Sequence, residues 1–222
     1  MSIYKRKIKA KKEVSNIDSS SFINALKDNI QAVTISAAVI VIVVGGFYYG
    51  RHNDNKKNLK LSDRLYKDFN DKSNIDLDQV KGYIADYKGN TADIGRLSLA
   101  KAYYEAGRYE DALLVYKELS KMTSEAQFKV SAYLGIGYSS QRLGNYEEAV
   151  EAFKLAFDNA GEAISLDLYK VEARIALGLS YEILGDKKEA LSQYDWVMDN
   201  FPNSQLVSPF LEQKAAFLER AL

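Results

Sequence analysis

From residue 93 onward, apolar residues recur three and four positions apart, which is the period of an amphipathic helix and not the alternation of a strand. The pattern divides into three units, and each unit predicts two helices joined by a tight turn. The predicted first helices carry three apolar sets: Ile94, Leu97, Leu99, Ala100 and Tyr103; Ala132, Tyr133, Ile136 and Gly137; and Ala173, Ile175, Leu177, Gly178 and Tyr181.

One short pattern marks the turn in each unit: AGRYEDA at 106–112, LGNYEEA at 143–149 and LGDKKEA at 184–190. The glycines are 37 and 41 residues apart. A glycine at a helix end reaches the left-handed conformation without a Cβ clash, and acidic residues suit the first turn of the next helix. Like units at such an interval predict a stack in which each hairpin buries its apolar face against its neighbours.

These units resemble the tetratricopeptide repeat. The small residue of the family's first helix is matched by Ala100, Gly137 and Gly178, and the aromatic of its second helix by Tyr116, Phe153 and Tyr194. The closing proline is present only as Pro202, and Ser140 replaces an aromatic residue in the second unit. The units are also longer than the family's period of about 34 residues. The resemblance implies three tetratricopeptide repeats over residues 91–204.

Shorter helical patterns flank the repeats. Residues 51–90 predict a linker and N-terminal capping helices, at 58–69 and 77–88. Residues 205–222 predict a C-terminal capping helix that begins at Ser208-Pro209, because serine suits the cap and proline the first turn. Its apolar stripe is Leu211, Ala215, Leu218 and Leu222. The fold class that we expect for the soluble part is an α-solenoid of tetratricopeptide-like helix hairpins with capping helices.

A single uncharged stretch of nineteen residues, AVTISAAVIVIVVGGFYYG, covers 32–50. A helix of this length rises roughly 28 Å, close to the thickness of the hydrocarbon core. Charged residues on both sides argue against a buried core helix, and the absence of a small-x-small site argues against a cleaved signal peptide. We therefore expect an N-terminal transmembrane helix, preceded by a basic cytoplasmic tail at 1–31.

The flanking charges favour a cytoplasmic N-terminus only slightly. Seven basic residues precede the span, and six lie in the twenty residues that follow it. The dense run YKRKIKAKK at 4–12 is interpreted as a topology signal in a disordered tail, and contact with anionic lipid or ribosomal RNA is the alternative.

Composition narrows the range of functions. The chain has 30 basic and 30 acidic residues, so the part after residue 50, with 23 basic and 27 acidic residues, is mildly acidic, which argues against nucleic acid as a partner. Cysteine is absent and His52 is the only histidine, so a metal site of clustered His and Cys cannot form. We expect no enzymatic activity, no cofactor and no metal; carboxylate hydrolysis is the only chemistry left open.

The order of tail, anchor and repeat domain resembles the membrane-anchored ancillary subunits of the bacterial Sec translocon, as does YKGNT at 87–91 leading into LSLAK at 97–101. This resemblance implies an inner-membrane protein with a periplasmic repeat domain. Its implied partners are translocon subunits, periplasmic chaperones or unfolded clients. The alternatives are a structural adaptor for cell-envelope assembly or division and, more distantly, a cytosolic import receptor anchored in the opposite orientation.

First helices of tetratricopeptide repeats line a concave groove, and matching the groove positions gives a set of candidate protein-binding residues: Leu97, Lys101, Tyr104, Leu134, Tyr138, Gln141, Ile175 and Leu179. The family's clamps for acidic chain ends use cations, whereas here leucine and isoleucine occupy several of those positions. We therefore predict no such clamp and a preference for apolar or amphipathic segments. The alternative is that these side chains pack against the capping helices.

Overall fold

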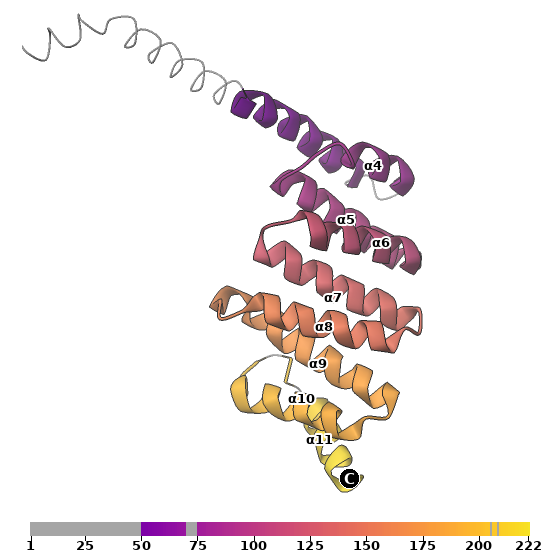
Figure 1. Cartoon of the computed structure of the whole chain (residues 1–222), viewed down its shortest axis with the longest axis vertical. Coiled ribbons are helices and arrows are strands. Elements are labelled where there is room, and N and C mark those ends of the chain that lie inside the picture. The colour runs from indigo at the N-terminus through magenta and orange to yellow at the C-terminus, as the bar shows by residue number, and fades with distance from the viewer. Residues whose placement is uncertain (1–49, 70–74, 205, 208) are drawn as a thin grey trace, which may run out of the picture. The chain divides into compact units, whose positions relative to one another are not determined.

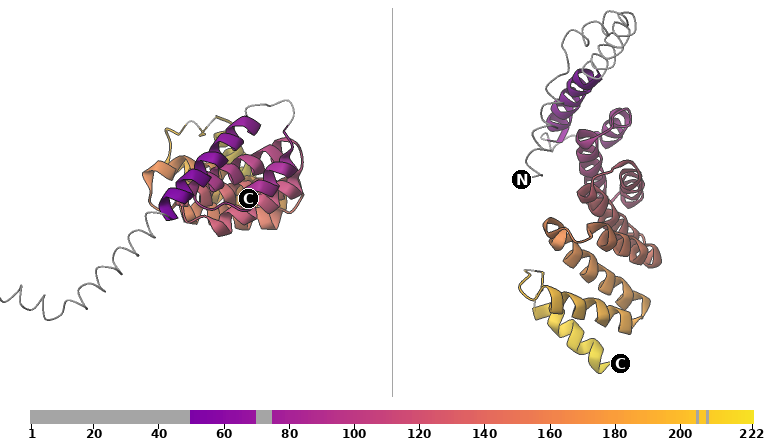
Figure 2. Two further views of the ribbon diagram at one scale, coloured as in Figure 1. Left: turned by 90° about the horizontal axis from the view of Figure 1, so that it is seen from above. Right: turned by 60° about the vertical axis from the view of Figure 1, so that its left-hand side comes forward.

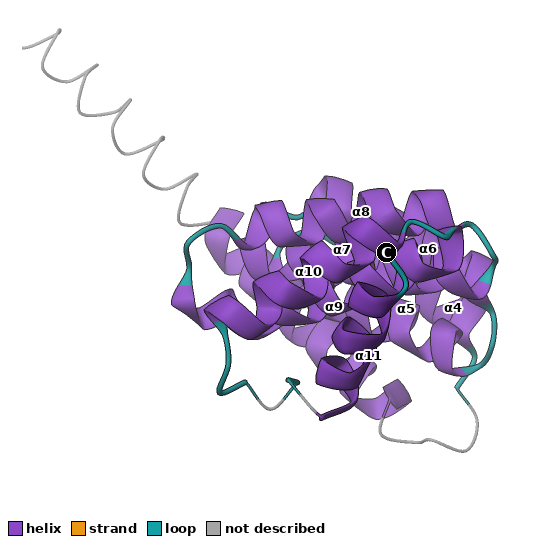
Figure 3. Ribbon diagram, turned by 90° about the horizontal axis from the view of Figure 1, so that it is seen from below, coloured by secondary structure: helices purple, strands orange, loops and turns teal. Residues whose placement is uncertain are grey.

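The computed structural model describes residues 50–69, 75–204, 206–207 and 209–222. Residues 50–69 are helical, and the elements that follow are α4 (Leu77–Ile84), α5 (Asn90–Glu105), α6 (Tyr109–Met122), α7 (Ala126–Arg142), α8 (Tyr146–Ala160), the 3-10 turn η1 (Ile164–Leu166), α9 (Asp167–Leu184), α10 (Lys187–Asn200) and α11 (Pro209–Arg220). The described residues contain no strand, which confirms the all-α class for that part of the chain (Figure 3).

The predicted basic tail and membrane span lie almost wholly outside the described residues, since only Gly50 of the span is among them. Over the part of the chain that is described, no helix combines the length and the apolar character needed to cross a bilayer. The membrane anchor therefore stays a prediction.

Residues 58–222 form one compact unit in which helix hairpins are stacked in chain order (Figure 1). Helix α5 packs on α6, α7 on α8, and α9 on α10, and each second helix also packs on the first helix of the next hairpin. The right-hand view of Figure 2 follows the same succession. The stack is the solenoid that the repeated hydrophobic pattern predicts.

The turn glycines have the predicted left-handed backbone. Their φ angles are 76° at Gly107, 80° at Gly144 and 82° at Gly185, and in each hairpin the next helix begins two residues later. Side chains of L-residues rarely tolerate such angles, so glycine allows the chain to reverse within a few residues.

Within a hairpin, a glycine of the first helix lies directly against an aromatic ring of the second. A Cβ atom added at Gly137 would lie 2.4 Å from the Phe153 ring, and one added at Gly178 would lie 2.3 Å from the Tyr194 ring. Both rings are fully buried. The small residue and the aromatic residue at the two family-matched positions therefore make the contact that sets the spacing of the two helices.

The same contact between a glycine and an aromatic ring also joins neighbouring hairpins. A Cβ atom at Gly135 of α7 would lie 2.4 Å from the ring of Tyr116, which belongs to α6 of the preceding hairpin. Helix α7 therefore has one glycine facing its own partner helix and another facing the hairpin before it, and close approach on both sides joins the hairpins into a continuous core.

Two helices precede the first hairpin, as predicted, but α4 is shorter than expected because it ends at Ile84 and not at residue 88. Leu61 and Leu65 of the preceding helical segment, together with Val80 and Ile84 of α4, are buried in the same apolar cluster as the first hairpin. These helices therefore cap the core at the N-terminal end of the unit.

Polar side chains of the first hairpin hold both ends of α4. Near its start, the Asp78 carboxylate accepts hydrogen bonds from the Tyr103 hydroxyl at 2.8 Å and from the Arg108 guanidinium at 3.0 and 3.1 Å. Just beyond its end, the buried Arg96 donates to the Tyr87 carbonyl at 2.9 Å. The short helix is thus fixed by charged groups as well as by apolar contact.

At the other end of the unit, α11 begins at Pro209, as the sequence predicts. Leu211, Ala215 and Leu218 are buried in the apolar cluster of the third hairpin. Leu222 was expected in the same stripe, but it is 59% exposed because the helix ends at Arg220.

Candidate functional site

The eight residues predicted to line a groove come from α5, α7 and α9, the first helices of the three hairpins. On α5, Lys101 is exposed and lies 3.8 Å from the Glu105 carboxylate. Leu97 and Tyr104 are half-buried against the core of the first hairpin, and the Tyr104 ring meets Tyr109 edge-on, with ring centroids 5.2 Å apart.

Ile94 was expected in the core but is 53% exposed. The buried face of α5 passes through Ala92, Arg96 and Leu99. A residue two positions from Ala92 and from Arg96 points to the opposite side of the helix, because each residue advances the helix by about 100°. Ile94 therefore adds to the exposed apolar surface of α5.

The three predicted residues on α7 differ in accessibility. Leu134 is only 4% exposed and lies in the apolar cluster that α7 shares with α9, so a partner protein cannot reach it. Tyr138 and Gln141 are half-buried, and both bridge to α9: the Tyr138 hydroxyl donates to Glu172 Oε1 at 2.9 Å, and Gln141 Nε2 donates to Ser180 Oγ at 2.8 Å.

A pocket of about 400 Å³ lies between α7 and α9, within the range of roughly 300–1,000 Å³ that is common for ligand pockets. It brings together three of the predicted residues, Tyr138, Ile175 and Leu179, while Leu97, Lys101, Tyr104 and Gln141 lie outside it. The full lining is Tyr138, Leu168, Glu172, Ile175, Ala176, Leu179 and Leu206. We call this the α7–α9 pocket.

Two leucines of the α7–α9 pocket were not predicted. Leu168 is 60% exposed and Leu206 is 39% exposed, so the pocket continues into an apolar surface that is open to solvent. Leu168 stands seven residues before Ile175 on α9, a helical spacing that could have identified it. Leu206 lies in the connection between α10 and α11, where no periodic pattern exists.

The polar edge of the α7–α9 pocket is a hydrogen-bonded pair. Burial, followed by the negative charge of Glu172, raises the pKa of the Tyr138 hydroxyl far above its ordinary value. The hydroxyl therefore stays protonated and donates to Glu172. The Tyr138 ring is itself held edge-on against Phe153, with centroids 5.1 Å apart.

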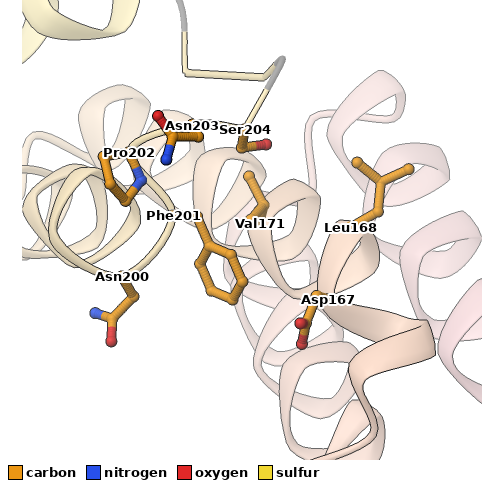
Figure 4. Close-up of a pocket in the computed structure, with 8 residues that line it drawn as sticks. All are labelled: Asp167, Leu168, Val171, Asn200, Phe201, Pro202, Asn203 and Ser204. Atoms are coloured by element: carbon orange, nitrogen blue, oxygen red, sulfur yellow. The ribbon is translucent and has the colours of Figure 1, made fainter.

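A second pocket, of about 420 Å³, lies where the start of α9 meets the connection after α10 (Figure 4). Its lining is more polar, and Asp167 in it is paired with Lys170 at 2.8 Å. Leu168 lines both pockets, which are therefore neighbours. The residues drawn in Figure 4 are Asp167, Leu168, Val171, Asn200, Phe201, Pro202, Asn203 and Ser204.

Among the described residues, no group of three or more His, Asp and Glu side chains is placed to hold a metal ion. What the α7–α9 pocket offers is an apolar lining, two accessible leucines and one hydrogen-bonded carboxylate. Such a lining suits an apolar side chain of another polypeptide.

Comparisons with known proteins agree with this arrangement of helices. Family models described as tetratricopeptide repeat match residues 129–203 and residues 97–125. The chain contains tetratricopeptide repeats. The repeats that the hydrophobic pattern predicts are therefore supported by the family models as well.

The solved structures that are similar to parts of this chain include two of one chaperone. The type III secretion chaperone SycD of Yersinia enterocolitica, in complex with a peptide of the translocator YopD, is 20% identical, with a TM-score of 0.49; the match covers 60% of this chain and 96% of SycD. A second structure of SycD is 21% identical, with a TM-score of 0.46, and covers 58% and 89% of the two chains. At this level of similarity neither structure indicates what this chain binds. A comparison with curated proteins finds no match.

Proposed function

We propose that the repeat domain holds segments of other proteins through the α7–α9 pocket, and that the chain is anchored in the bacterial inner membrane beside the Sec translocon, where it assists protein export. The observation that carries the binding function is the apolar α7–α9 pocket with two solvent-exposed leucines, on helices of a tetratricopeptide-repeat stack. Accessible apolar surface of this kind is typical of protein-binding sites.

The chain offers a matched pair of leucines for a test. Leu168 lines the α7–α9 pocket and is 60% exposed, whereas Leu114 on α6 lines neither pocket described above and is 59% exposed. Replacing either residue by aspartate removes a similarly exposed leucine from a helix and introduces the same charge. A difference in binding between the two variants therefore reports the position of the residue and not its exposure.

Binding is measured with the full chain in detergent and a fluorescent peptide that carries one leucine in a host of serine and alanine. Leu168→Asp should weaken binding about tenfold or more, because burial of a leucine side chain is worth about 1.5–3 kcal/mol. Leu114→Asp should bind as the parent does. Equal loss in both variants, or none in either, would contradict the proposed site.

The proposed location rests on the uncharged stretch at 32–50, the basic residues before it and the resemblance to translocon subunits. Alkaline phosphatase fused after Leu222 should be active if the repeat domain is periplasmic, and inactive if the orientation is reversed. Co-purification of translocon subunits after mild cross-linking would support the role in export. Recovery of envelope synthases or division proteins in their place would favour the structural adaptor.

A further inference from the structure

The lining of the α7–α9 pocket carries one charged residue, Glu172, and no lysine or arginine. Within the described part of the chain, Glu172 forms no ion pair. Among the described residues, its hydrogen-bond partner is the hydroxyl of Tyr138, which is a neutral donor. The pocket therefore combines an apolar lining with a negative charge that no cation of the described chain neutralises.

The position of this charge is fixed. The Tyr138 ring is packed edge-on against Phe153, and its hydroxyl donates from α7 to one carboxylate oxygen on α9, Oε1 of Glu172. One hydrogen bond leaves the second oxygen, Oε2, with acceptor capacity, because an ionised carboxylate accepts about four hydrogen bonds. The carboxylate is thus held at the edge of the apolar lining formed by Ile175 and Leu179.

Two cations of the first helices, Lys101 and Arg142, already have partners. Lys101 lies 3.8 Å from Glu105, and Arg142 donates to the Tyr109 hydroxyl at 2.7 Å. These cations do not line the α7–α9 pocket. An acidic ligand would therefore meet Glu172 without a compensating cation in the lining, whereas a basic ligand would meet a complementary charge.

We propose that the α7–α9 pocket selects polypeptide segments in which a lysine or arginine stands next to an apolar anchor residue. This inference rests on the proposed function and specifies its ligand class. The anchor occupies the apolar lining, and the neighbouring cation pairs with the Glu172 carboxylate at the edge. The preference is the opposite of that of a clamp for acidic chain ends.

The test uses three fluorescent peptides in the same serine and alanine host, which carry Leu-Lys, Leu-Glu or Ser-Lys at the centre. With the full chain in detergent, Leu-Lys should bind about two- to fivefold more tightly than Leu-Glu, the range of a solvent-accessible ion pair. The ratio should shrink at high salt, which screens such a pair. Ser-Lys should bind weakly, because it lacks the anchor.

Glu172→Gln should abolish the preference for Leu-Lys over Leu-Glu while keeping an oxygen that accepts the Tyr138 hydrogen bond. The matched control is Glu151→Gln on α8, which removes an exposed carboxylate outside the α7–α9 pocket and should leave the ratio unchanged. Unchanged melting temperatures of both variants verify that the fold is kept.

The outcomes separate this inference from the proposed function. Equal binding of Leu-Lys and Leu-Glu, with both lost in Leu168→Asp, would overturn the charge preference and leave the pocket as a binding site. A preference that survives in Glu172→Gln would likewise overturn the role of Glu172. If no leucine peptide binds the parent chain, the proposed function and the preference both fail.

Discussion

Gly178→Ala should destabilise the repeat domain, although alanine is the better helix former. Gly178 lies inside α9, and its added Cβ atom would stand 2.3, 2.8 and 2.9 Å from three ring atoms of Tyr194. Carbon atoms pack at about 3.5–4.0 Å, so either the ring or the helix must move.

The Tyr194 ring has little freedom to move. It is fully buried, and its hydroxyl donates to Glu182, which also accepts from Lys214 at 2.7 and 2.8 Å. Overpacking of this kind costs about 1–3 kcal/mol, and an overlap with three ring atoms belongs at the upper end. The gain in helix propensity offsets about 1 kcal/mol. A net loss of about 2 kcal/mol lowers the melting temperature by about 4–8 °C in a domain of this size.

The matched control is Gly82→Ala in α4. Gly82 is exposed, and its added Cβ atom would have no neighbour within 4 Å. This variant gains helix propensity without a clash, so its melting temperature should rise. Thermal unfolding followed by circular dichroism measures both variants. If Gly178→Ala melts at or above the temperature of the parent, the Tyr194 ring does not pack directly against Gly178, and the reasoning is wrong.

Three further substitutions test charged side chains. The hydrogen bond from Arg108 holds the pKa of the Asp78 carboxyl below its ordinary value. The carboxylate therefore stabilises the fold above a pH of about 4, and this effect is lost as the pH falls through the lowered pKa. Asp78→Asn should melt at a lower temperature than the parent at neutral pH, and the difference in melting temperature should disappear in acid. Burial raises the pKa of the Asp195 carboxyl, so the folded protein favours its protonated form. Stability is therefore highest below the ordinary pKa and falls as the pH rises and the buried carboxyl ionises. Asp195→Asn should melt slightly higher than the parent at neutral pH and at the same temperature in acid; a lower melting point at neutral pH would contradict this sign. Arg96→Leu removes the buried partner of Glu118, 3.0 Å away, and should cost about 1–3 kcal/mol in denaturant unfolding; an unchanged midpoint would show that the arginine is dispensable.

The hairpins could be predicted from the sequence because each rests on local chemistry. Gly107, Gly144 and Gly185 mark the turns, since a left-handed backbone angle excludes most other residues. Gly178 and Tyr194 could each be marked as repeat positions, since the same two positions recur in each unit. These features depend only on short stretches of sequence, so the solenoid could be predicted from the sequence alone.

The candidate site could be predicted from the sequence only in part. Leu134 matched a groove position, but it is buried in an apolar cluster of α7, α8 and α9, and this depends on how closely neighbouring hairpins approach. Leu206 joins the α7–α9 pocket from a connection without periodicity. Arg96 was not singled out, because a hydrophobic pattern places charged residues in solvent, whereas this one is 1% exposed. Each of these positions depends on contacts between segments distant in sequence.

The most direct test of the binding function is a map of where a ligand lies. A leucine peptide whose anchor is replaced by a photoreactive leucine is bound to the full chain, irradiated, and its attachment points are located by mass spectrometry. The α7–α9 pocket predicts attachment to Tyr138, Ile175 and Leu179, and loss of attachment in Leu168→Asp. Attachment concentrated on the second helices α6 and α8, or spread evenly over the chain, would contradict the account.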